Sequence, residues 1–375
     1  MRRRYTLLSA LVLLLFVTAC SPATVEPEVQ IPTEAPVVTE AGSSITLTDA
    51  LGREVEFEQL PQRIVVAGRA SSLLANALYL FPEASERIVA IENRNTQSAS
   101  PILPVIDAKA DDKMFLEKNA GPEQISPAQP DVVVLKTYMA ESLGEPLEVL
   151  GIPVVYLDLE TPEQFFRDIT TLGELFGNAE RAQEVQRYYQ ERLDDIDERT
   201  DSISETEKPD VLFLQYSDKG GEVAFKIPPA SWLQTTMVEL VGGTPIWTEA
   251  SESGGWGIVN FEQIAAWNPD QVYVIYYPGD AKPITETLKS DPNWQAIQAV
   301  HEDQLFAFPG DFLSWDQPDT RWIMGLSWLF SKVQPELADG VDIMQEIDQF
   351  YEFLYRLDQE TIEDEVIPIL NGDLP

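Results

Sequence analysis

The chain has 375 residues, 44% of them hydrophobic and 10% aromatic, which is enough to fill the cores of two domains of ordinary size. It carries 25 Lys and Arg against 63 Asp and Glu, a formal net charge of −38. Such an acidic chain is repelled by nucleic-acid phosphates and anionic lipid headgroups. The charge therefore excludes nucleic acid as a partner and indicates a solvated, acidic surface.

Residues 1–20 have the pattern of a secretory signal peptide. Three arginines precede an apolar stretch, Leu7 to Val17, that is too short to span a bilayer comfortably, and small residues lead to Cys20. The segment resembles a bacterial lipoprotein signal, in which that cysteine becomes the lipidated first residue. We therefore expect an extracytoplasmic protein anchored through Cys20, on the periplasmic side or outer surface of the membrane. Because Cys20 is the one cysteine, we expect no disulfide.

Residues 21–44 are rich in Pro, Glu, Thr and Ser and lack helical or strand periodicity. This composition predicts a disordered tether between the anchor and the folded body. The body is expected to open with a hairpin in "ITLTDALGREVEF", from residue 45. Apolar strands then alternate with helical patterns as far as residue 160, which predicts an α/β lobe with a parallel sheet.

Residues 161–204 keep a helical spacing of apolar side chains, with a break near Gly177 and Asn178, and predict a long lobe-spanning helix. Strand and helix patterns then alternate again over residues 205–375, which predicts a C-terminal α/β lobe. The expected order is therefore N-terminal lobe (45–160), spanning helix (161–204) and C-terminal lobe. This organisation predicts an α/β fold of two Rossmann-like lobes.

A short turn occurs once in each predicted lobe. Glu123 and Glu262 are each followed by Gln-Ile and each precede the proline of a Pro-Asp pair by seven residues. Pro122 suits the first position of a helix, and Asn260 suits an N-cap. Both glutamates then fall in the first turn, where a carboxylate complements the helix dipole. The spacing alone is therefore equally consistent with glutamates that only stabilise their helices and with glutamates that bind a partner.

Positive signs of catalysis are few. The one histidine, His301, is interpreted as a surface residue, and neither a phosphate-binding glycine loop nor a Gly-x-Ser-x-Gly motif is present. We expect no enzyme activity, no cofactor and no metal-ligating residues. The alternative is a surface-anchored carbohydrate-active or sensor protein that uses Glu123 and Glu262 as a carboxylate pair. Because the two glutamates occupy equivalent positions in two similar lobes, we do not expect their carboxylates to face each other across one glycosidic bond.

Five segments in order carry a family resemblance: "LTDALGREVEFEQLPQRIVVAG", the ExxxxxxPD turn in each half, "LGELFGNAERAQEV", "DPNWQAIQAV" and "QLFAFPGDFLSWDQPDTRWIMGLSWL". They resemble the substrate-binding lipoproteins of iron-siderophore and cobalamin-type ABC transporters. The resemblance implies two lobes joined by one long α-helix with a ligand cleft between them. It also implies a monomer that delivers a ferric siderophore, haem, cobalamin-like chelate, molybdate or tungstate to a permease and its ATPase.

In that family one glutamate per lobe pairs with permease arginines, so the resemblance assigns docking to Glu123 and Glu262. Pro127 should shorten the first of the two helices, which makes Glu262 the better match.

The ligand is expected at loops that follow the carboxyl ends of the strands. The candidate contacts are Arg69, Ser71, Lys136, Tyr138, Tyr216, Trp256, Tyr276, Trp315 and Arg321. Basic side chains at Arg69, Lys136 and Arg321 suit an anionic ligand, although pairing with the many acids explains them equally. Trp256 and Trp315 lie in polar loops, where ligand contact and loop packing are equally expected. Trp322 and Trp328 lie in a helical stripe and are assigned to the core.

Overall fold

The computed structural model describes residues 44–93, 101–251 and 254–375. The predicted signal peptide with Cys20, and the predicted tether as far as residue 43, lie outside the described residues. Contacts group Gly42 to Pro375 into one compact unit. Within the described ranges, no helix is both long enough and apolar enough to cross a membrane.

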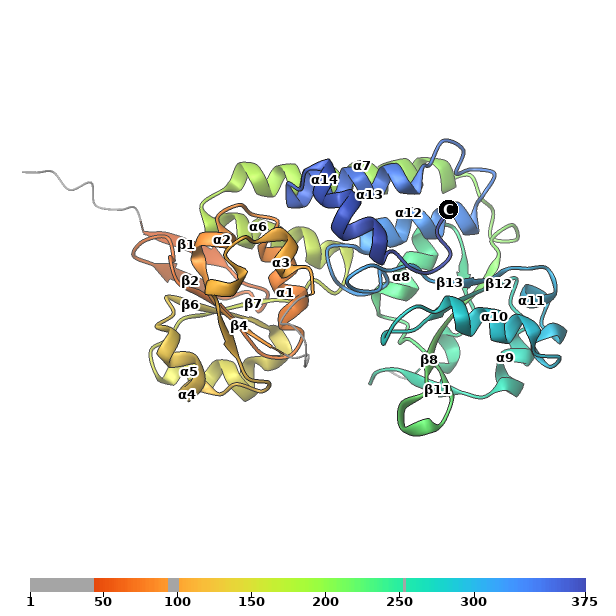
Figure 1. The fold of residues 1–375 in the computed structure, drawn as a ribbon, viewed down its shortest axis with the longest axis horizontal. Coiled ribbons are helices and arrows are strands. Elements are labelled where there is room, and N and C mark those ends of the chain that lie inside the picture. The colour runs from red at the N-terminus through yellow and green to blue at the C-terminus, as the bar shows by residue number, and fades with distance from the viewer. Residues whose placement is uncertain (1–43, 94–100, 252–253) are drawn as a thin grey trace, which may run out of the picture. The chain divides into compact units, whose positions relative to one another are not determined.

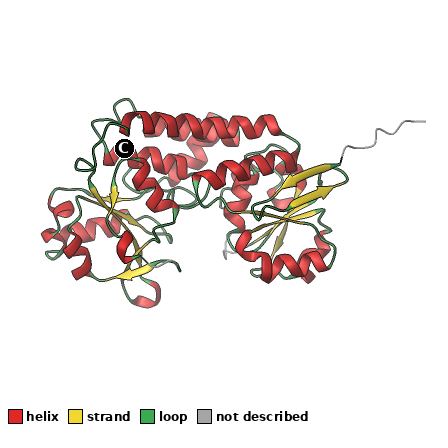
Figure 2. Ribbon diagram, turned by 180° about the vertical axis from the view of Figure 1, so that it is seen from behind, coloured by secondary structure: helices red, strands yellow, loops and turns green. Residues whose placement is uncertain are grey.

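The first lobe is built on five parallel strands in the order β5-β4-β3-β6-β7. The strands are β3 (Ile64–Val66), β4 (Ile88–Glu92), β5 (Met114–Leu116), β6 (Val132–Lys136) and β7 (Val154–Leu157). Every residue of β3, β6 and β7 is buried, because helices cover the sheet on both faces (Figure 2). Its helices are α1 (Ser71–Leu78), α2 (Ala84–Arg87), α3 (Leu103–Ile106), α4 (Pro122–Ile125) and α5 (Glu145–Val149). The predicted parallel α/β architecture is confirmed.

The predicted hairpin is also present, as β1 (Ile45–Thr48) and β2 (Glu54–Phe57) in an antiparallel pair. Asp49 holds its turn. The Oδ1 atom of Asp49 accepts hydrogen bonds from the amides of Leu51 and Arg53 at 3.0 and 3.1 Å, and its Oδ2 atom pairs with the Arg53 guanidinium at 2.7 Å. The side chain of one residue thus fixes both the turn and the neighbouring cation.

The second lobe has a six-stranded sheet in which β11-β9-β8-β12-β13 follow one another and β10 pairs with β8. The strands are β8 (Asp210–Ser217), β9 (Ala224–Ile227), β10 (Thr244–Pro245), β11 (Gly257–Val259), β12 (Gln271–Ile275) and β13 (Leu305–Ala307). Its helices are α8 (Leu233–Leu240), α9 (Phe261–Trp267), α10 (Lys282–Ser290), α11 (Gln298–His301) and α12 (Trp322–Val333). Strands β8, β12 and β13 are parallel, whereas β9 runs antiparallel to β8 and β11 antiparallel to β9. This lobe is therefore mixed where the first is all-parallel.

The predicted single helix over 161–204 is wrong: two helices occupy this segment, α6 (Pro162–Phe176) and α7 (Ala179–Thr200). Gly177 has a φ of 65°, a left-handed conformation that ends α6, and the Asn178 side chain accepts a hydrogen bond from Arg181 N at 3.0 Å and begins α7. The 22 residues of α7 extend about 33 Å. Near its start Arg181 donates to Leu80 O in the first lobe, and near its end Arg199 donates to Leu337 O beyond α12. Of these two helices, α7 is therefore the one that spans the lobes.

The C-terminal segment, expected to belong to the second lobe only, contacts both lobes. Helix α13 (Ile343–Tyr355) lies beside α7, and α14 (Gln359–Thr361) follows it (Figure 1). Arg192 of α7 pairs with Glu346 of α13 at 2.6 Å, while Arg356 donates to the carbonyl oxygen of Tyr79 in the first lobe at 2.9 Å. The boundary between the lobes is thus crossed by α7 and again by the chain after α13.

One hydrophobic core cluster contains residues of both lobes. Phe165 of α6, Tyr189 of α7 and Trp322 of α12 meet in it, with ring centroids 4.3 Å apart for Phe165 and Tyr189 and 5.4 Å apart for Tyr189 and Trp322. Trp322 and Trp328 are 1% and 0% exposed, so their assignment to the core is confirmed.

Candidate functional site

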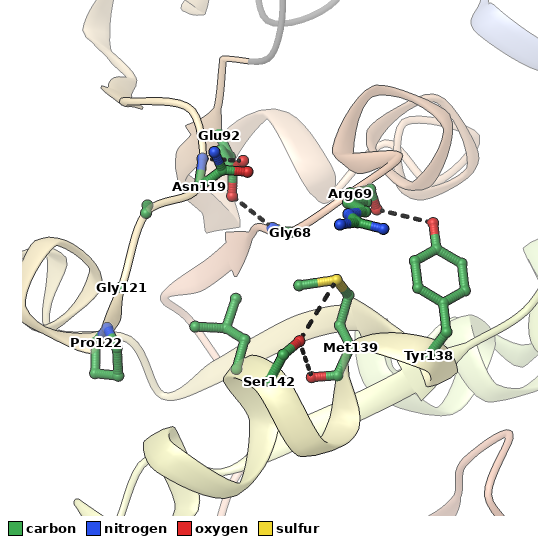
Figure 3. Close-up of a pocket in the computed structure, with 11 residues that line it drawn as sticks. Gly68, Arg69, Glu92, Asn119, Gly121, Pro122, Tyr138, Met139 and Ser142 are labelled. Atoms are coloured by element: carbon green, nitrogen blue, oxygen red, sulfur yellow. Dashed lines mark hydrogen bonds between the residues drawn. The ribbon is translucent and has the colours of Figure 1, made fainter.

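A pocket of about 350 Å³ lies at the carboxyl ends of the first-lobe strands, and we call it the first-lobe pocket. The residues that shape it include Gly68, Arg69, Glu92, Asn119, Tyr138 and Met139 (Figure 3). Gly68 follows β3, Glu92 ends β4 and Tyr138 follows β6. This is the sheet edge at which α/β proteins bind ligands.

The buried carboxylate of Glu92 holds the loops of this pocket in place. Its Oε2 atom accepts from Gly68 N at 2.7 Å and its Oε1 atom from Asn119 N at 2.9 Å. Gly68 has a φ of 80°, and a Cβ there would lie 3.1 Å from Met139 Cγ, so the position favours glycine. The sequence places Glu92 at the start of a strand-end loop expected to line the ligand site, but its role in holding the loops could not be assigned, because those loops meet only in the fold.

Two of the predicted contact residues meet at the first-lobe pocket. The Tyr138 hydroxyl lies 3.4 Å from the carbonyl oxygen of Arg69, and the Tyr138 side chain is 54% exposed. The Arg69 guanidinium is exposed and has neither an ion pair nor a side-chain hydrogen bond among the described residues. Figure 3 shows both side chains on the same side of the pocket. They offer a ligand one cation and one aromatic face.

A second pocket, of about 180 Å³, lies at the carboxyl ends of β12 and β13, and we call it the second-lobe pocket. Its walls include Tyr276, Tyr277, Asp311, Phe312, Ser314 and Gln317. The predicted contact Tyr276 is half-buried, and its hydroxyl donates to Asp218 Oδ2 at 3.1 Å. Its ring lies 5.7 Å from that of Tyr216, another predicted contact.

Tyr277 and Asp316 lie in strand-end loops expected to line the ligand site, but the sequence did not single out either as a contact. Asp316 is fully buried, and its Oδ2 atom accepts from the Tyr277 hydroxyl at 2.8 Å and from Gln234 Nε2 at 2.9 Å. Burial raises the pKa of Asp316, and neutral donors stabilise its carboxylate only in part. This anchor fixes the Tyr277 ring, which lies 6.0 Å from the predicted contact Trp256. The tandem tyrosines at the end of "VYVIYY" were the available signal.

Four predicted contacts lie in the interior instead. Ser71, Lys136, Trp315 and Arg321 are each 0% exposed. The Ser71 hydroxyl donates to Glu92 O at 2.9 Å, and Trp315 Nε1 donates to Asp311 Oδ2 at 3.0 Å. Their positions correct the expectation of ligand contact at these residues.

The two buried cations are both paired with acids. Lys136 Nζ lies 2.7 Å from Glu160 Oε1, while Arg321 lies 2.7 Å from Asp311 and 2.6 Å from Asp319. A buried cation requires such partners, and the acidic chain supplies them. Of the three basic candidates, Arg69 therefore reaches a pocket and the other two do not.

The repeated turns fold alike. Glu123 and Glu262 are exposed and occupy the second position of α4 and α9, and Ile125 and Ile264 are both 0% exposed beneath them. Asn260 caps α9 by accepting from Gln263 N at 2.8 Å, as predicted. Helix α4 ends at Ile125, two residues before Pro127, so the expected shortening is confirmed.

The exposed glutamates lie in different lobes, and neither is among the residues that line the two pockets. This placement gives no support to a carboxylate pair acting on one sugar.

Residues 64–312 match the family model described as periplasmic binding protein. The match covers more than half of the chain, so the chain belongs to this family, and the predicted two-lobed fold is confirmed. It is 22% identical over 296 residues to YvrC of Bacillus subtilis, named an uncharacterized ABC transporter substrate-binding lipoprotein, covering 78% of this chain and 86% of the relative. It is also 22% identical over 255 residues to the molybdate-binding protein MolA of Haemophilus influenzae, covering 62% of this chain and 69% of the relative.

Solved structures support the same fold. A periplasmic solute-binding protein from Veillonella parvula has a TM-score of 0.70 at 22% identity and covers 87% of this chain and 98% of its own. MolA bound to molybdate has a TM-score of 0.66 at 18% identity, covering 84% and 98%. Helicobacter pylori CeuE with Ni(II) bound has a TM-score of 0.66 at 19% identity, covering 86% and 99%.

Proposed function

We propose that this protein is the lipid-anchored, extracytoplasmic substrate-binding component of an ABC importer. It would capture a metal-containing small molecule and deliver it to the permease and its ATPase, without a catalytic step of its own. The main support is the pair of pockets at the carboxyl edges of the two sheets, within a fold whose relatives are substrate-binding proteins. Cys20 would carry the anchor, and residues 21–44 would form the tether of a monomer.

Among the candidate ligands we favour a metal chelate with aromatic or apolar groups and a negative charge, such as a ferric siderophore or a tetrapyrrole, over a molybdate or tungstate oxyanion. A small oxyanion bound in a dry site requires several converging donors. The pockets offer one basic side chain, Arg69, because Lys136 and Arg321 are committed to buried acids. Tyr138, Tyr276, Tyr277 and Trp256 instead supply ring surfaces, which suit a large chelate.

Docking on the permease would use Glu123 and Glu262. Each is exposed on a short helix in its own lobe, so two similar permease halves would find matching carboxylates. Because both carboxylates are exposed to solvent, salt ions can screen them, so their attraction to permease arginines should weaken at high salt. Replacing both glutamates by glutamine while transport stays intact would show that docking does not depend on them.

The first experiment is mass spectrometry and metal analysis of the full chain purified with its native ligand. Tryptophan fluorescence titrations would follow, with a ferric tris-catecholate, haemin and molybdate as probes. For a chelate probe, Arg69→Gln should weaken binding about tenfold, because one charge-assisted contact is lost. The matched control Arg187→Gln removes an exposed arginine on α7 that lines neither pocket, and should change affinity less than about twofold.

The possible results separate the two levels of this proposal. Tight molybdate binding with no chelate binding would overturn the ligand class and leave the carrier role standing. Absence of any copurifying metal compound, together with no binding of any probe, would overturn the carrier role itself.

A further inference from the structure

We propose that the C-terminal segment is a latch that ties the two lobes together and holds their separation nearly constant. The latch consists of Tyr351, Tyr355 and Arg356, at the end of α13. It joins the carboxyl end of α1 in the first lobe to the Asp319–Arg321 turn of the second. The family match ends at residue 312, before these elements, and the inference does not depend on which ligand the protein binds.

On the first-lobe side, the latch binds carbonyl oxygens at the end of α1. The Tyr355 hydroxyl donates to Asn76 O at 3.1 Å, and Arg356 donates to Tyr79 O and Leu80 O, each at 2.9 Å. The last carbonyls of a helix lack partners within the helix and carry its negative dipole end, so a guanidinium there is favourable. Arg356 adopts a left-handed φ of 60°, which ends α13 and is uncommon for a residue with a side chain.

On the second-lobe side, the same residues enter a buried polar network. The Tyr355 hydroxyl lies 2.7 Å from Thr320 Oγ1, and the Tyr351 hydroxyl accepts from Arg321 Nε at 3.1 Å. Tyr351 also donates to Asp311, which pairs with Arg321. One helix end therefore satisfies polar groups of both lobes.

The lobes also touch directly within this network. Asn76 Nδ2 of α1 donates to Asp319 Oδ2 at 2.6 Å, and Asp319 Oδ1 accepts from Arg321 Nη1 at 2.6 Å. All three side chains are buried.

Separation of the lobes at this junction would break several of these contacts together. Buried donors and acceptors that lose their partners are costly, and a connected network resists opening more than one bond does. A single helix such as α7 would act as a hinge, but here it is supplemented by the latch and by the Asn76–Asp319 contact. We infer that the ligand-free protein keeps a preset gap between the lobes, and that any large opening requires release of the latch.

The test measures lobe separation in the ligand-free full chain by double electron–electron resonance. Spin labels would be placed on Glu145→Cys in α5 and Glu286→Cys in α10, in a chain whose one native cysteine is removed by Cys20→Ser. The parent chain should give one narrow distance distribution. Tyr355→Phe combined with Arg356→Met should roughly double its width, because the latch contacts of both side chains are lost.

The matched control is Tyr273→Phe combined with Arg63→Met. The Tyr273 hydroxyl donates to Gln271 Oε1 at 2.8 Å inside the second lobe, and Arg63 donates to Ala128 O and Gln129 O at 2.6 and 2.9 Å inside the first lobe. These changes remove the same chemical groups without removing a contact between the lobes or an anchor of α7, so the width should stay as in the parent.

Hydrogen exchange gives a second readout. Amides of α1 should exchange about fivefold faster in the latch variant than in the parent, whereas their exchange rates in the control variant should be unchanged. If the double latch variant fails to fold by circular dichroism, Arg356→Met alone serves, since Arg356 is exposed and Tyr355 keeps its buried contacts. A parent distribution that is already broad would overturn the latch, and so would equal widths in latch and control variants.

Discussion

The first and second lobes share a turn between helix and strand but line their pockets with different side chains. In each turn a glutamate at the second helical position is followed by a left-handed residue, Gln129 at φ 49° or Asn268 at φ 44°, just before the Pro-Asp pair. The aspartates then bind the neighbouring strand region: Asp131 accepts from Arg63 N at 3.0 Å, and Asp270 accepts from Asp210 N at 2.8 Å.

The pockets do not follow this repetition. The first-lobe pocket carries a cation, Arg69, beside Glu92 and Tyr138, whereas the second-lobe pocket is lined by four aromatic side chains and one carboxylate, that of Asp311, and by no basic residue among those the structure describes. The sheets differ as well, because the antiparallel pairs formed by β9 and β11 make the second sheet a mixed sheet, whereas the first is parallel throughout. A repeated outer surface suits a partner with two similar halves, and unlike pockets suit a ligand whose two sides differ.

The largest predicted effect concerns two fully buried cations, Lys136 of the first lobe and Arg321 of the second. Arg321→Met would leave Asp311 and Asp319 without their cation, and both side chains are 0% exposed. We expect the free energy of unfolding to fall by about 3–5 kcal/mol. Lys136→Met would leave Glu160, whose side chain is 44% exposed and can be solvated, at a cost of about 1 kcal/mol. Urea denaturation measures both.

Lys289→Met is the control for this pair of substitutions. Its partner Asp303 has an 83% exposed side chain, so the loss should be below about 0.5 kcal/mol. Equal losses of unfolding free energy for Arg321→Met and Lys136→Met would mean that the ion pairs of Arg321 contribute no more to stability than the pair of Lys136 with Glu160.

A pH series contrasts one carboxylate from each lobe. Burial raises the pKa of Asp316, whereas at Asp107 the opposing effect of burial is outweighed by hydrogen bonds from Ser85 and Tyr79, so its pKa is lowered. A carboxyl group whose pKa is raised by folding stabilises the folded state at a pH below its pKa in the unfolded chain, which is about 4. This stabilisation is lost as the pH rises through the pKa of the folded state. A lowered pKa gives stability above that value that is lost as pH falls.

Thermal unfolding between about pH 3 and pH 7 checks the two signs. Asp107→Asn should flatten the loss of stability on acidification, and Asp316→Asn should flatten the loss as pH rises from the acidic end. Slopes that change in the same direction in the two variants would contradict the assignment.

The shared turn predicts a smaller effect at its caps. Asn260→Ala removes the side-chain cap of α9 and should cost about 1 kcal/mol. In α4 the N-cap is Gly121, which has no side chain to lose, so the first lobe offers no equivalent loss. Asn268→Ala would place a less tolerant residue at φ 44° and should cost a similar amount, about 1 kcal/mol. Calorimetry of the single variants would test whether the cap or the left-handed residue contributes more.

Local patterns made much of the fold predictable. The turns at Glu123 and Glu262, the hairpin and the parallel strands depend on spacing within about ten residues, and all were found. The break at Gly177 is visible in the sequence, but the helical spacing of apolar residues on both sides of it predicts one continuous helix. Lys136 and Arg321 were misplaced because their partners, Glu160 and Asp319 among them, could be assigned only once the loops were folded. The contacts of Arg356 with α1 join residues about 280 apart in sequence, and no local pattern marks them.

The smallest predicted effect distinguishes Glu123 from Glu262, the two glutamates proposed for docking on the permease. A Cβ at Gly121 would lie 2.5 Å from Glu123 Oε2, so the Glu123 carboxylate folds back against its own helix start. A carboxylate held at this helix start is favoured by the positive end of the helix dipole, so an approaching arginine gains less from pairing with it. Glu262→Gln should therefore slow association with the permease about threefold, and Glu123→Gln by about twofold or less. Stopped-flow association at low and high salt would measure both, and a larger effect for Glu123 would mean that its carboxylate swings outward on docking.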